Sequence, residues 1–70
     1  MNLFEGNVGV EYIIKDILTA DEELNAFLFS LGCYSGEPIT LISRKRSGCV
    51  VSIKDGRYSM DKELAQAILI

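Results

Sequence analysis

The sequence predicts a mainly β fold: a small closed or nearly closed barrel of five strands, with one α-helix capping an open end and a short helical turn near the C-terminus. Three observations lead to this prediction. Short segments rich in β-branched residues are separated by tight turn signals. Only one stretch, residues 19–32, has a clear helical period. The chain has 70 residues, too few for two packed sheets, and a barrel hides strand edges.

The first expected strand covers residues 8–17. Its sequence, VGVEYIIKDI, is rich in β-branched and aromatic residues, and its apolar residues partly alternate. This pattern is typical of a strand with one buried face.

The helix is expected in residues 19–32, TADEELNAFLFSLG. Its apolar residues fall at i, i+3, i+4 and i+7, which is one face of a helix, and this spacing turns the three leucines inward. These residues are Leu24, Phe27, Leu28 and Leu31. Thr19 and Glu22 fit a capping box at the start, and Gly32 is placed to end the helix in the left-handed conformation.

Four more strands and a helical turn are expected after residue 36. EPITLISRKR and SGCVVSIKDG predict two strands joined by an Arg-Ser-Gly loop, with Pro38 at the first position of a strand, where it is tolerated. Cys49 falls on the more apolar face of the second strand. Asp55-Gly56 signals a two-residue hairpin leading to a strand in RYSM. DKELAQA predicts a turn or two of helix, and ILI a final buried strand.

The composition indicates one cytoplasmic domain, residues 1–70, with no evident catalytic site. No signal peptide or membrane-spanning segment is recognisable. Histidine is absent, so no serine or cysteine has the usual base partner. Fifteen residues separate Cys33 from Cys49 in the sequence, so the close-spaced pairs of a zinc site are missing. We expect both thiols to be reduced and to pack as small apolar groups.

The charges are distributed unevenly along the chain. Residues 1–37 hold seven acids and one base, and residues 38–70 hold six bases and three acids. Two interpretations stay open. The surface is dipolar and steers a partner, or the charges are solvated and have no role in function. The basic run Arg44, Lys45 and Arg46 suits phosphates, but an acidic chain without an exposed aromatic ladder argues against nucleic-acid binding.

Two segments carry a resemblance to a known family: FLFSLGCYSGEPITLI and GCVVSIKDGRYSMDKELAQAILI. Their order of leucine, glycine, turn, glycine, apolar strand, hairpin and Ala-containing helix resembles the FeoA family of small bacterial proteins associated with ferrous iron uptake. The matching positions are Leu28, Leu31, Gly32, Gly36, Ile39, Gly56, Met60, Ala65, Ile68 and Ile70. The sequence departs from the family at three places, where Phe27 replaces an arginine, Cys33 a leucine and Ser35 a proline.

The resemblance implies an SH3-like barrel that is not an enzyme. It implies an accessory protein of ferrous iron uptake that binds or regulates the cytosolic part of the FeoB GTP-binding permease. The alternative is a transition-metal-binding or metal-responsive regulatory module. Association with Fe²⁺ is implied by the family alone, since the sequence offers no evident metal ligands. The expected partner-binding residues lie at the helix end, the following turn and the basic hairpin: Phe27, Phe29, Tyr34, Arg44, Lys45 and Arg46.

Overall fold

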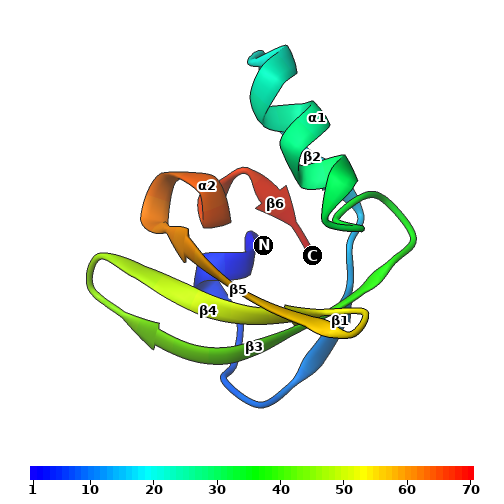
Figure 1. Cartoon of the computed structure of the whole chain (residues 1–70). Helices are drawn as coiled ribbons and strands as arrows, with labels where there is room; N and C mark the ends of the chain where they lie inside the picture. The colour runs from blue at the N-terminus through cyan, green and yellow to red at the C-terminus, as the bar shows by residue number, and fades with distance from the viewer.

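Two successive β-hairpins form the centre of the molecule, in a computed structural model that describes all residues from 1 to 70 (Figure 1). The main sheet is antiparallel with the strand order β1-β3-β4-β5. These strands span Glu11–Ile13, Pro38–Lys45, Gly48–Ile53 and Gly56–Asp61. A second, two-stranded sheet pairs β2 (Asp16–Ile17) with β6 (Ile68–Leu69). Figure 1 shows this pair on the opposite side of the core from the main sheet.

Three helical segments complete the fold. A 3-10 turn, η1 (Leu3–Glu5), and the short helix α2 (Lys62–Gln66) lie over the concave side of the main sheet, whereas α1 (Glu22–Ser30) projects away from it (Figure 1). A reciprocal capping box that the sequence analysis missed begins η1. In it, Asn2 Oδ1 accepts from the Glu5 N–H and Glu5 Oε1 accepts from the Asn2 N–H. None of the helices has the length and apolarity that crossing a membrane would require.

The core lies between the main sheet and the layer formed by β6, α2 and η1. Strand β4 shows how it is built, because Cys49, Val51 and Ile53 point inward at alternate positions and are all buried. The buried hydrophobic residues are Leu3, Ile14, Leu28, Cys33, Ile39, Leu41, Cys49, Val51, Ile53, Met60, Ala65, Ile68 and Ile70. No charged residue is among them.

The mainly β fold with one principal helix is confirmed, but the strand predicted over residues 8–17 divides into β1 and β2. Residues 8–10 form a turn instead, in which Gly9 has a positive φ of 86°. The Ile14 N–H donates to the Glu37 carbonyl, and the next N–H, of Lys15, donates to Leu69. The chain therefore passes from the main sheet to the second sheet at these two residues, and six strands result where five were expected.

Two local predictions were wrong in detail. The N-cap of α1 is Asp21, whose carboxylate accepts from the N–H groups of Glu23 at 3.0 Å and Leu24 at 3.1 Å, so Thr19 does not cap the helix. The turn between β4 and β5 consists of Lys54 and Asp55, while Gly56 is the first residue of β5. A side chain at Gly56 would collide with the Tyr58 ring, which explains the glycine without a turn.

Candidate docking surface

Helix α1 touches the core through one fully buried side chain, Leu28. Leu24 and Leu31, both expected to point inward, are only half-buried. Phe27 and Phe29 are 51% and 64% exposed. Since α1 projects from the barrel (Figure 1), only its C-terminal turn meets other elements, and most of its apolar surface faces solvent.

The Gly-Cys-Tyr-Ser-Gly turn after α1 fixes the orientation of Phe29. Gly32 takes the predicted left-handed conformation, with φ of 88°, and its N–H donates to the Phe29 carbonyl. Cys33 enters the core, and its N–H donates to the Leu28 carbonyl at 2.9 Å. Tyr34 then returns to the surface and stacks on Phe29, with ring centroids 4.8 Å apart. Two of the predicted partner-binding residues are thus brought together.

Lys54, from the β4–β5 turn, completes this arrangement. Its ammonium nitrogen lies 5.8 Å from the centroid of the Tyr34 ring and 3.3 Å from Glu37 Oε2. The hydrogen bond with Glu37, followed by the negative charge of Glu37, raises the pKa of Lys54. We call Phe29, Tyr34, Lys54 and Glu37 the aromatic latch. Lys54 and Glu37 were not among the predicted site residues, because no local pattern links residues that only the fold brings together.

A shallow hollow of about 410 Å³ lies beside the latch on α1. It is lined by Glu22, Asn25, Ala26 and Phe29, which follow the i, i+3, i+4, i+7 spacing of one helix face. The small side chain of Ala26 leaves room between the carboxylate of Glu22 and the ring of Phe29. We call these four residues the α1 groove. The spacing of these four residues in the sequence is consistent with one helix face, but the predicted site residues were taken from the apolar face and the turn after it.

The basic residues Arg44, Lys45 and Arg46 are exposed at the β3–β4 end. Figure 1 places this end and the C-terminal end of α1 on opposite sides of the barrel. Arg44 is held by the protein itself, because its guanidinium donates to the carbonyls of Phe4, at 3.1 Å, and of Gly6. The six predicted partner-binding residues therefore do not form one surface. Phe29 and Tyr34 stack on each other, and the basic run lies across the barrel from them. Phe27 is two residues from Phe29 in α1 and points to another side of the helix.

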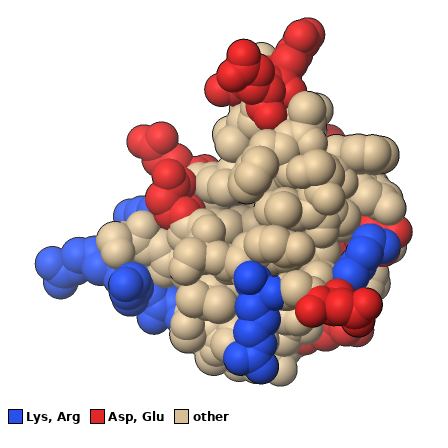
Figure 2. All heavy atoms as spheres, viewed as in Figure 1, with Lys and Arg blue, Asp and Glu red and all other residues tan.

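The charges separate in space as well as along the chain. Figure 2 shows acidic side chains at the free end of α1 and basic side chains gathered over the β3–β4 end. The acids that begin α1 are Asp21, Glu22 and Glu23, and no basic residue lies in its last turn. The separation is incomplete, since acidic side chains also lie near α2 (Figure 2). The exposed surface of α1 thus combines aromatic rings with an acidic tip.

Neither cysteine is available for surface chemistry. Cys33 is 1% exposed, and burial raises the pKa of its thiol to about 11. Burial also raises the pKa of the Cys49 thiol, and the positive charge of Arg44 partly opposes that shift. No three side chains of His, Cys, Asp or Glu lie close enough together to share a metal ion. This donor set does not fit a transition-metal centre, which draws on thiolate, imidazole and carboxylate ligands in groups.

Comparison with known proteins identifies the family. The FeoA domain family model matches residues 1–70. Among solved structures, an iron uptake regulatory protein (FeoA) is 25% identical, with a TM-score of 0.87 over 97% of this chain and 91% of that one. Stenotrophomonas maltophilia FeoA in complex with zinc is 18% identical, with a TM-score of 0.85 over 99% of this chain and 87% of that one.

The fold also occurs inside a larger protein. A manganese-dependent transcriptional repressor has a TM-score of 0.87 at 20% identity, covering 97% of this chain but 39% of the repressor. No curated protein matches the chain. The S. maltophilia protein is described as an SH3 domain protein, in agreement with the SH3-like barrel predicted here. With the family model matched along its whole length, the chain belongs to the FeoA family.

Proposed function

We propose that this protein is a cytosolic accessory factor of bacterial ferrous iron uptake that binds the cytosolic part of a FeoB-type GTP-binding permease. It acts by binding and not by catalysis. Membership of the FeoA family supports the pathway, and the S. maltophilia relative has been suggested to be a ferrous iron transport activating factor. The chemistry of the chain agrees with a binding role, since it has no histidine and its thiols are buried.

The exposed aromatic end of α1 is the observation that carries this proposal. Large apolar side chains that are exposed together mark interaction sites, and aromatic residues are enriched at interface hot spots. Phe29 is 64% exposed, yet its ring is held against Tyr34. A ring that is already ordered loses little conformational entropy when a partner covers it. We therefore propose Phe29 and Tyr34 as the centre of the docking surface. Phe27, on another side of α1, and the basic hairpin are proposed as separate contacts.

The test is a titration of the full chain with the cytosolic domain of the cognate permease, with and without guanine nucleotide. We expect saturable binding that Phe29→Ala weakens at least about tenfold, as for a hot-spot aromatic. Val8→Ala is the matched control, because Val8 is also an exposed apolar residue, at 52%, but lies in the loop before β1. Absence of saturable binding in both nucleotide states would overturn the function. Equal affinities of the Phe29→Ala and Val8→Ala variants would overturn the assignment of the docking surface to the end of α1.

A metal-responsive role is the second candidate, because the fold is shared with manganese-dependent repressors and with a zinc-bound FeoA. The residues of this chain do not fit it: both thiols are buried and no cluster of three ligands exists. Anaerobic calorimetry with ferrous, manganous and zinc ions separates the candidates. Affinity that falls when Cys33 or Cys49 is replaced by serine would favour the metal role, and absence of binding heat would remove it.

A further inference from the structure

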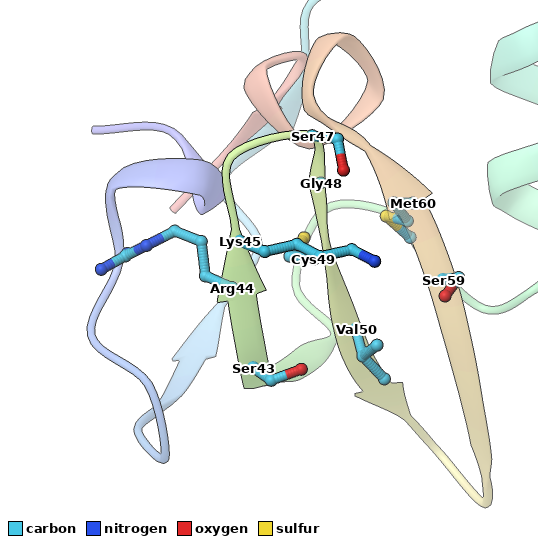
Figure 3. A pocket seen from close by; sticks show the side chains of 9 residues that line it. All are labelled: Ser43, Arg44, Lys45, Ser47, Gly48, Cys49, Val50, Ser59 and Met60. Carbon is cyan, nitrogen blue, oxygen red and sulfur yellow. The ribbon is translucent and has the colours of Figure 1, made fainter.

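A hollow of about 350 Å³ lies on the outer face of the main sheet, where β3, β4 and β5 meet (Figure 3). It is distant from the docking surface on α1, at the opposite side of the barrel. The lining residues come from the two hairpin strands, their connecting turn and β5: Ser43, Arg44, Lys45, Ser47, Gly48, Cys49, Val50, Ser59 and Met60. Figure 3 shows the Lys45 side chain extending across the hollow, while Arg44 points away from it.

The backbone keeps this hollow open. Gly48 lies in its floor, and strand alternation places it on the outer face together with Val50. A β-carbon at Gly48 would collide with the Met60 carbonyl oxygen of β5, so no side chain is tolerated at this position of the lining. The rim is fixed as well, because the Lys62 N–H donates to the Ser47 carbonyl at 3.1 Å. The hollow is therefore part of the folded structure and not a gap between mobile side chains.

Apart from Arg44, the polar side chains around the hollow have no hydrogen-bond partner inside the protein. The hydroxyls of Ser43, Ser47 and Ser59 make no intramolecular hydrogen bond, and Lys45 forms no ion pair, since the one salt bridge of the chain joins Lys54 to Glu37. These three hydroxyls come from three different elements and lie around the hollow, with Val50 between Ser43 and Ser59 in the sheet register (Figure 3).

The electrostatics of the hollow favour an anion. Its lining contains two cations, Arg44 and Lys45, and no carboxylate. The nearest acid in the sheet register is Asp61, opposite Gly48. Its carboxylate accepts from the Leu64 N–H at 2.8 Å as the N-cap of α2. Arg44 is held by the carbonyls of Phe4 and Gly6, which leaves Lys45 as the cation free to meet a ligand.

We propose that this hollow binds a tetrahedral oxyanion: inorganic phosphate or the phosphoryl group of a small organic molecule. Lys45 supplies the charge, and a serine hydroxyl of the lining donates to an anion oxygen. The volume is at the lower end of small-molecule sites and exceeds what a bare phosphate fills. Val50, which is half-buried on the outer face, would then contact the carbon skeleton of an organic phosphate.

The experiment is an NMR titration of the ¹⁵N-labelled full chain with inorganic phosphate, at constant pH and ionic strength maintained with chloride. We expect saturable shifts confined to the amides of residues 43–50 and 58–60. A parallel titration with glycerol 3-phosphate distinguishes inorganic phosphate from an organic phosphate as the ligand. Tighter binding than phosphate indicates an organic phosphate, and equal affinity indicates the free anion.

Two variants, each lacking one positive charge, test whether the position of that charge matters. Lys45→Gln should weaken binding at least about tenfold, because it removes the charge-assisted hydrogen bond. Arg57→Gln should leave the affinity unchanged, because Arg57 is exposed on β5 but does not line the hollow. Shifts that do not saturate, or equal weakening in both variants, would overturn the site. No permease takes part in this experiment, so its outcome is independent of the proposed docking function.

Discussion

Leu28 and Phe29 are adjacent in α1 but are expected to have separable roles in stability and binding. Leu28 is 0% exposed and belongs to the core cluster. Truncation of a buried leucine to alanine typically lowers the free energy of unfolding by about 2–5 kcal/mol. A domain of this length is stabilised by roughly 4–10 kcal/mol in total. Leu28→Ala should therefore remove a large part of the stability, and it should release α1, which has no other fully buried side chain.

Phe29→Ala should have a much smaller effect on stability. The ring is 64% exposed, so little buried apolar area is lost, and its stacking on Tyr34 contributes on the order of 0.5–1.5 kcal/mol. Urea denaturation followed by far-ultraviolet circular dichroism measures both variants. The m value of Phe29→Ala should equal that of the unmodified protein, whereas release of α1 should lower the m value of Leu28→Ala, because less surface is exposed on unfolding. A loss of less than about 1 kcal/mol for Leu28→Ala would refute the anchoring of α1 through this residue. So would equal losses for both variants.

Three further predictions concern the backbone, the thiols and the latch. Gly48→Ala should lower the Tm more than any exposed substitution, because its β-carbon would lie 2.2 Å from the Met60 carbonyl oxygen; an unchanged Tm would show that β4 and β5 can separate there. The Cys33 thiol should resist a thiol reagent at pH 8 until the protein unfolds. Stability should then fall as the pH rises from about 9 to about 11, since the unfolded thiol ionises before the folded one; rapid labelling of the native protein or a flat profile would contradict this. Lys54→Gln should speed hydrogen exchange in α1 without changing exchange in β4, and equal acceleration in both would show a global effect instead.

The elements that sequence reasoning found are those with local signals. Strands β3, β4 and β5 follow the alternation of their apolar residues, and α2 follows DKELAQA. The left-handed Gly32 was also predicted, because a helix that stops at Leu31 needs a residue that tolerates positive φ. In each case the side chains of the segment itself determine the conformation.

The features that were missed depend on contacts between distant segments. The chain passes from one sheet to the other at Ile14 and Lys15, because Glu37 and Leu69 offer carbonyl acceptors on different sides. No sequence pattern within residues 8–17 predicts this crossing. The candidate site divides in the same way. The exposure of Phe29 followed from the helical period, whereas its pairing with Tyr34 and Lys54 required the fold.

The distribution of phenylalanine gives the most general argument for an interaction surface. The chain has three phenylalanines, and none belongs to the buried core. Phe4 is half-buried against it, and Phe27 and Phe29 are mostly exposed. A domain this small buries only about 60% of the surface that its unfolded chain exposes, so each large apolar side chain left outside is a substantial loss of core area. Two exposed rings on one projecting helix therefore leave apolar area outside the core that a protein acting alone would need for its stability. They become favourable when a partner covers them, because ligands that bind only the folded state add to its stability.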